Sequence, residues 1–266
     1  MPIARVGDIN MYYEVHGEGF PLVMIMGLSA DVNWWDPLFI KEVSKGFKVV
    51  VFDNRGAGRS DKPKVEYTIR MFADDTVKLM DTLNIGKAHI LGVSMGGMIA
   101  QEIAINYPER VEKLVLCVTS PGGSKAIPPS QEVISLLASD RSKIPPEDLA
   151  RATLSLLYPE EYLKTHPEVA ELTVKRISMY MIPPDAYMRQ LNAVMNFDAY
   201  DRLNNIKAPT LVVSGGKDIL VPPENGKILA EAIPNAKLVI FENAGHGLIA
   251  QEREAFTQLL LDFLSK

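Results

Sequence analysis

A serine with glycines on both sides lies where a short apolar run gives way to a helical pattern. Residues 92–97 read GVSMGG and place Ser94 between a predicted strand and a predicted helix. In that context a G-x-S-x-G segment holds a nucleophilic serine on a sharp turn, where small neighbours avoid crowding. The helix that follows directs free N–H groups at developing negative charge. The pattern favours a nucleophile, the alternative being a glycine-rich turn in which Ser94 only caps the helix.

A serine hydroxyl needs a base to remove its proton, and the chain has four histidines. His16 and His89 fall in predicted strands, where a structural imidazole is expected. His166 lies between a threonine and a proline in a helical region. Only His246 follows a core strand in a loop, where glycines on both sides leave its ring free to project. The sequence therefore predicts His246 as the base.

The base in turn needs a carboxylate that fixes its tautomer and stabilises its charged form. Asp218 follows the predicted strand at residues 210–213 and so lies at a strand's carboxyl end, where chemistry collects in open α/β sheets. An earlier core strand is followed by Thr119 and Ser120, so it offers no rival carboxylate. We predict that Asp218 orients His246; the alternative is a turn-forming aspartate that caps the next element.

Short β-rich runs alternate with amphipathic helical patterns in two blocks of the chain. Strands are predicted at residues 11–16, 22–26, 47–52, 88–91, 114–118, 210–213 and 237–241. Helices are predicted at residues 69–83, 95–107, 224–233 and 252–264. This alternation is typical of an α/β fold with a mostly parallel sheet and helices on both faces.

Residues 121–196 separate the two blocks and differ from them in composition. No glycine occurs between Gly123 and Gly215, and nine of the eighteen prolines fall in this segment. Apolar residues at helical spacing predict several short helices between the prolines. The chain would then form a core from residues 1–120 and 197–266 with a helical lid, the alternative being an appendage that only adds stability. Met181 and Met188 are expected to line an apolar pocket under the lid, although methionine also suits a plain core.

Ser94, Asp218 and His246, in that chain order after successive strands, resemble the α/β-hydrolase family. The segments FDNRGAGRS at residues 52–60 and GGKDILVP at residues 215–222 are also similar to recurring loops of that family. The likeness covers nearly the whole chain and is strongest to small lidded carboxylesterases and enol-lactone hydrolases. It implies an eight-stranded sheet and a serine hydrolase of esters with small or medium, largely apolar acyl groups. Such an enzyme works through an acyl-enzyme, without a metal or a cofactor.

Acyl transfer needs two N–H groups that hold the negative oxygen of the tetrahedral intermediate. In similar hydrolases one belongs to the residue after the nucleophile, here Met95, and the other to the loop after an early strand, here Leu28. Gly27 allows that loop to turn sharply. Gly27 and Trp34 are both expected to contact the substrate, and the alternative for Trp34 is that it only packs in the core. The family often has His-Gly in this loop. Met26 stands at the histidine position here, so the imidazole that often braces the loop is missing.

Other functions of the same three residues stay open at this point. An enol-lactone, a carbon–carbon bond beside a ketone, or perhydrolysis would use the same chemistry. A ligand receptor that keeps the fold without turnover is an alternative of another class. Haloalkane and epoxide hydrolases are disfavoured, because those relatives carry an aspartate where Ser94 stands.

Composition limits the partners and the compartment. The net charge is −5 and no lysine or arginine cluster occurs, so no nucleic-acid partner is expected. Cys117 is the only cysteine, which leaves no intrachain disulfide and no Cys/His zinc spacing. No apolar run reaches the roughly 18 residues of a membrane span, and no basic-then-apolar leader opens the sequence. We expect a cytoplasmic protein with a small-molecule ester substrate and no membrane partner, and a homodimer is left open.

Overall fold

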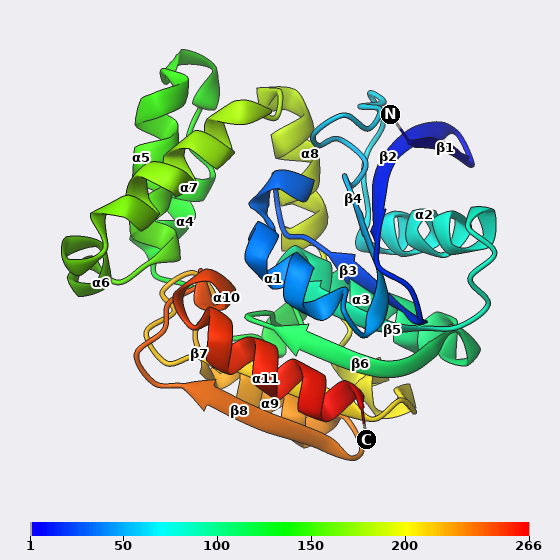
Figure 1. Cartoon of the computed structure of the whole chain (residues 1–266). Coiled ribbons are helices and arrows are strands. Elements are labelled where there is room, and N and C mark those ends of the chain that lie inside the picture. Colours follow the sequence, from blue (N-terminus) through cyan, green and yellow to red (C-terminus); the bar gives the residue numbers. More distant parts are fainter. Residues whose placement is uncertain (1, 266) are drawn as a thin grey trace.

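The structure, a computed structural model, describes residues 2–265 and is built on an eight-stranded sheet (Figure 1). The strands are β1 (Ile3–Val6), β2 (Ile9–His16), β3 (Phe20–Ile25), β4 (Phe47–Phe52), β5 (Ala88–Val93), β6 (Val111–Cys117), β7 (Thr210–Gly215) and β8 (Ala236–Phe241). Their order across the sheet is β1-β2-β4-β3-β5-β6-β7-β8. β2 runs antiparallel to β1 and β4, and the other neighbours are parallel. The expected mostly parallel sheet is therefore confirmed.

Helices cover both faces of the sheet, as the sequence predicts. One face carries α2 (Ile69–Thr82), α3 (Met95–Asn106) and α9 (Glu224–Ala232). The other carries α1 (Pro37–Val43), α10 (Leu248–Gln251) and α11 (Arg253–Leu264). The sequence analysis did not find β1 and α1, because four and seven residues are too few to show a period.

The segment between β6 and β7 is helical, as its apolar spacing predicts. Its helices are α4 (Gln131–Leu137), α5 (Pro146–Leu157), α6 (Glu160–Thr165), α7 (Pro167–Met179) and α8 (Pro184–Met195). Pro146, Pro167 and Pro184 each occupy the first turn of a helix, where a missing N–H breaks no hydrogen bond. In Figure 1, α4 to α7 form a group at one end of the molecule, while α8 lies closer to the core.

The parallel strands bring three loops to one edge of the sheet. β5, β7 and β8 point the same way, and Ser94, Asp218 and His246 follow them in the loops at their carboxyl ends. The helical segment leaves the core after β6, which lies between β5 and β7. It therefore emerges at the same edge as the three candidate residues.

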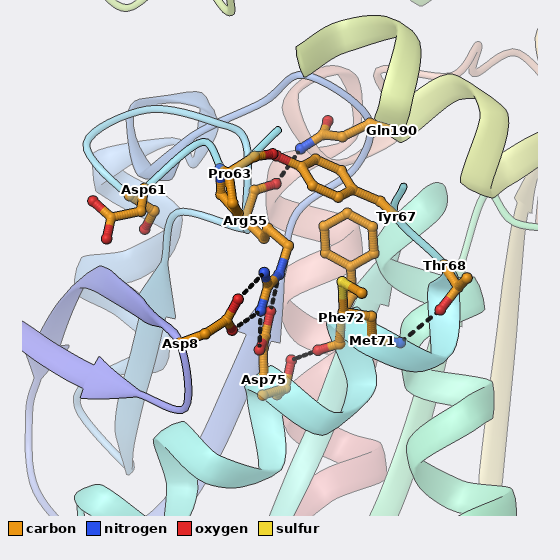
Figure 2. Close-up of polar contacts among 12 residues, drawn as sticks. Asp8, Arg55, Asp61, Pro63, Tyr67, Thr68, Met71, Phe72, Asp75 and Gln190 are labelled. Atoms are coloured by element: carbon orange, nitrogen blue, oxygen red, sulfur yellow. Dashed lines mark hydrogen bonds and ion pairs between the residues drawn. The ribbon is translucent and has the colours of Figure 1, made fainter. Parts of the chain in front are cut away.

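A buried arginine in the loop after β4 joins that loop to the turn after β1 and to α2 (Figure 2). The guanidinium of Arg55 donates to both carboxylate oxygens of Asp75 at 2.7 and 2.8 Å. It also donates to both oxygens of Asp8, at 2.7 and 3.1 Å. Burial disfavours the charge on Arg55, but the hydrogen bonds to Asp75 and Asp8 outweigh this and raise its pKa. Two carboxylates thus compensate one buried cation.

Removing that cation should destabilise the fold strongly. Arg55→Met should lower the free energy of unfolding by about 3 kcal/mol or more, because it leaves the buried Asp75 unpaired. Arg151 provides the control, since it pairs with Glu147 on the exposed surface of α5. Arg151→Met should change the free energy of unfolding by no more than about 0.5 kcal/mol. Urea denaturation measures both, and equal losses would contradict the role given to the buried pair.

Candidate active site

Ser94 occupies a strained turn between β5 and α3. Its backbone has φ 57° and ψ −121°, a conformation that residues with a Cβ seldom adopt. Its N–H donates to the carbonyl of Cys117 at 2.9 Å, and its own carbonyl accepts from Thr119 Oγ1 at 2.7 Å. The side chain makes no capping hydrogen bond to α3. The hydroxyl is therefore not engaged as a helix cap, which was the alternative interpretation.

Two glycines allow this turn to form because backbone segments press against it. A Cβ added at Gly92 would lie 2.2 Å from the carbonyl oxygen of Gly96. A Cβ added at Gly96 would lie 2.1 Å from the carbonyl oxygen of Ile25, at the end of β3. Real carbon atoms do not approach an oxygen so closely, so any side chain here would push β3 and α3 apart.

His246 and Asp218 are joined directly. Nδ1 of His246 lies 2.8 Å from Oδ2 of Asp218, and both residues are buried. The other carboxylate oxygen, Oδ1, accepts the N–H groups of Leu220 and Val221, each at 2.8 Å. These two bonds fix the carboxylate, so Oδ2 remains for the imidazole. A proton on Nδ1 leaves Nε2 as a hydrogen-bond acceptor.

The other three histidines have surroundings of a different kind. His89 packs against the rings of Phe20 and Phe47, and burial lowers its pKa to about 4. His16 pairs with Glu14, and His166 stacks on a neighbouring tyrosine. Of the four, only His246 lines the same cavity as Ser94.

That cavity has a volume of about 160 Å³ and is lined by the sheet edge and the helical segment. Its lining is mostly apolar and includes Leu28, Trp34, Trp35, Leu149, Ile177 and Met181. Among the predicted substrate contacts, Gly27, Trp34 and Met181 line the cavity. Met188 does not: it lies on α8, is 37% exposed, and lines an adjoining hollow. Arg141 and Tyr187 line both this hollow and the cavity.

Charged residues also line the cavity, and the sequence analysis did not single them out. Arg141, Arg176 and Asp36 are among its lining residues. These residues belong to no motif, because they come from separate short helices or helix termini. The spacing of apolar residues, which predicted the helices, gives no information on charged ones.

The loop after β3 is braced by two amide side chains that the sequence analysis also missed. Asn54 Nδ2 donates to the carbonyl of Met26 at 3.0 Å. Gln190 of α8, fully buried, accepts the N–H of Ser29 at 2.8 Å through Oε1. Its Nε2 donates to the carbonyl of Arg55 at 2.8 Å, the contact drawn in Figure 2. These contacts brace the loop that has methionine where the family often has histidine.

This loop passes close to the serine. A Cβ added at Gly27 would lie 3.0 Å from the Cβ of Ser94 and 3.5 Å from its hydroxyl oxygen. Leu28, the next residue, lines the cavity, and Met95 is the first residue of α3. The two predicted N–H donors therefore belong to segments that border the serine.

Residues 2–265 contain neither a cluster of metal ligands nor a helix that could span a membrane. Within that range, no group of three or more histidine, cysteine, aspartate or glutamate side chains could hold a metal ion. No helix in the described part of the chain is long and apolar enough to cross a membrane.

The fold and the site define an α/β hydrolase. The sequence matches the family described as alpha/beta hydrolase fold over residues 21–252. The chain belongs to this family.

Similar proteins match nearly the full length of the chain. RutD of Azorhizobium caulinodans, assigned as a carbamate hydrolase, is 29% identical over 265 residues, which are 99% of this chain and 98% of that protein. The enol-lactonase from Burkholderia xenovorans LB400 has a TM-score of 0.89 at 29% identity, with 100% of both chains covered. A thermophilic esterase from Thermogutta terrifontis, solved with malate bound, has a TM-score of 0.85 at 29% identity, covering 98% of this chain and 95% of that one. The resemblance to esterases and enol-lactone hydrolases is confirmed, and hydrolysis is supported as the general activity.

The strain at Ser94 can be measured apart from any activity. A residue with a Cβ in this conformation destabilises the folded state by about 1–3 kcal/mol, whereas glycine adopts the conformation without strain. Glycine also lowers the free energy of unfolding by about 0.5–1 kcal/mol, because the unfolded chain is more flexible. Ser94→Gly should therefore be more stable than Ser94→Ala by about 1 kcal/mol in urea denaturation. Both variants lack the hydroxyl, so their difference isolates the Cβ. An alanine variant as stable as the glycine variant would show that the turn is unstrained.

Proposed function

We propose that the protein is a serine hydrolase that cleaves carboxylic esters of small or medium, largely apolar acyl groups through an acyl-enzyme. One observation carries the proposal: Ser94 and His246 line one cavity, and His246 is held by Asp218 at 2.8 Å. A nucleophile, a base and a carboxylate that orients the base are the parts that such a reaction needs.

In the proposed reaction the hydroxyl oxygen of Ser94 attacks the ester carbonyl carbon while Nε2 of His246 takes the hydroxyl proton. The tetrahedral intermediate then breaks its bond to the alcohol oxygen, and the alcohol leaves with the proton from His246. Water next attacks the acyl carbon, again with His246 as base. The bond to Ser94 breaks, the serine regains its proton and the carboxylic acid is released. Asp218 keeps Nδ1 protonated and stabilises the imidazolium formed in each half.

The oxyanion of the intermediate is assigned to the backbone N–H groups of Leu28 and Met95. Each such donor contributes on the order of 3 kcal/mol to the transition state. Gly27 supports this assignment, since its lack of a side chain lets the loop lie against Ser94. Gln190 and Asn54 hold the same loop at either end of its turn.

The helical segment at residues 121–196 is proposed as the lid of this site. It supplies Ile177 and Met181 to the lining, among other residues. Tyr180 of the same segment stacks on the guanidinium of Arg59, at 4.8 Å, and that guanidinium lies 3.7 Å from the ring of Tyr12 in the core. The stack gives the segment a specific contact to β2 and to the loop after β4.

The size of the cavity supports a small substrate. A dry cavity of roughly 150 Å³ admits benzene, and this one holds about 160 Å³. The similarity to the enol-lactonase and the esterase makes lactones and short esters the first substrates to test. A carbamate belongs in the same panel because of the similarity to RutD.

Ser94→Ala should lower the turnover of p-nitrophenyl acetate and butyrate by on the order of 10³-fold or more, because it removes the nucleophile. An organophosphonate should label the wild type at one equivalent and leave the variant unlabelled. His246→Ala should lose activity as well, while His166→Ala, outside the cavity, should keep it. A variant without Ser94 that retained wild-type turnover would overturn the mechanism. Tight binding of esters without turnover in the wild type would indicate a receptor instead.

Gln190→Leu should lower kcat about tenfold or more and change KM less, because it frees the loop that carries the Leu28 donor. Asn192→Ala, on the exposed face of the same helix, should leave both constants near the wild-type values. Steady-state kinetics with one short ester, together with a thermal melt of each variant, separates the effect from unfolding. A Gln190→Leu protein with normal kcat would remove this residue from the site.

A further inference from the structure

The cavity beside Ser94 contains a positive charge without a counter-ion. Arg141 belongs to a short 3-10 helix (Arg141–Lys143) and lines the cavity. No carboxylate within residues 2–265 forms an ion pair with it, although the chain has many surface pairs. Its Nε is buried and has no hydrogen-bond acceptor. Arg141 as a whole is partly buried, and a charge that is shielded from water without a counter-ion is less stable than a paired one. An anion that enters the cavity would therefore bind favourably beside it.

The guanidinium of Arg141 is held in place by Tyr187 of α8. Its Cζ lies 3.5 Å from the centre of the tyrosine ring, and Nη2 donates to the tyrosine hydroxyl at 2.7 Å. That hydroxyl donates onward to the carbonyl of Leu137 at 2.9 Å, and Tyr187 is fully buried. The cation is therefore positioned in advance by neutral groups, and none of them neutralises it.

The second arginine of the cavity differs on this point. Arg176 faces Asp36, with Nη2 3.5 Å from Oδ2, and both side chains are largely buried. These two charges cancel, so the lining charges leave one positive charge in excess, on Arg141. Burial lowers the pKa of Arg141 from its usual value, but a guanidinium in a protein remains protonated.

We propose that the substrate of this site carries a carboxylate away from the bond that is cleaved, and that Arg141 binds it. A carboxylate supplies the single negative charge that the cavity lacks, and its two oxygens match the planar donors of a guanidinium. The remaining lining is apolar, so the chain between the two ends of the substrate is short and apolar. Half-esters of short dicarboxylic acids and lactones with an acidic side chain have this form.

This inference rests on the proposed ester hydrolysis and makes its substrate class narrower. An apolar lid face by itself would favour uncharged acyl groups. Arg141 adds a cation to this apolar lining. The preferred substrate therefore has an apolar chain that ends in a negatively charged group.

The test compares esters that differ only in that charge. Monomethyl succinate, glutarate and adipate are each paired with the carboxamide in which CONH₂ replaces the carboxylate, and hydrolysis is followed by proton release. The wild type should favour the best acid over its amide by about tenfold or more in kcat/KM, the range of a hydrogen bond to a charged group. In Arg141→Met this ratio should fall toward one. Arg151→Met, an exposed arginine of the neighbouring α5, should keep the wild-type ratio.

A binding measurement separates this proposal from the proposed reaction. Calorimetry with Ser94→Ala should show that monomethyl glutarate binds about tenfold or more tightly than its amide. In Ser94→Ala/Arg141→Met the difference should vanish. If this binding holds while the wild type hydrolyses no ester, the reaction is wrong and the carboxylate site stands.

Three results would overturn the carboxylate site. The first is a wild type that hydrolyses the acids and their amides with nearly equal kcat/KM. This result would exclude the carboxylate site and leave the proposed reaction intact. The second is an acid-to-amide ratio that stays unchanged in Arg141→Met but is lost in Arg176→Met. This result would show that Arg176, and not Arg141, binds the carboxylate. The third is an equal fall of kcat/KM for the acid and for the amide in Arg141→Met. This result would show that Arg141 has only a structural role.

Discussion

The site depends on how closely three backbone segments approach one another at the turn after β5. The start of α3 lies against the end of β3 with no room for a Cβ at Gly96, and β5 meets α3 with no room at Gly92. At this close contact Ser94 has a φ of 57°, and its hydroxyl makes no capping hydrogen bond. The surrounding strands stabilise this strained conformation. Part of that stabilisation is the hydrogen bond from the N–H of Ser94 to the carbonyl of Cys117.

The sheet and the helical segment contribute different things to the same cavity. Loops at the carboxyl ends of parallel strands bring Ser94, Asp218 and His246 to one edge, and the backbone around each is fixed by short hydrogen bonds. The helical segment supplies most of the remaining wall. Gln190 connects the two parts, because this residue of α8 holds the loop next to the serine. A change in the position of α8 would therefore alter both the wall and the loop.

Two arginines illustrate how the same side chain can serve stability or binding. Arg55 is enclosed by the carboxylates of Asp8 and Asp75, so its charge is compensated within the fold and holds distant segments together. Arg141 is packed on Tyr187 and has no such partner in the described chain. The first arrangement is complete without a ligand, whereas the second is completed only when an anion enters the cavity.

Local patterns were enough to predict the sheet, most helices and the serine turn, because glycine spacing and apolar periodicity reflect backbone demands within a few residues. They also pointed to Asp218 and His246 as partners, since loops after parallel strands must meet at one edge. Gln190, Arg141 and the Arg55 pairs could not be read from the sequence in this way. Gln190 contacts Ser29 across 161 positions of the chain, and Arg55 contacts Asp8 across 47. Such contacts exist only where packing brings separate segments together, and no local periodicity records which polar side chains will face each other there.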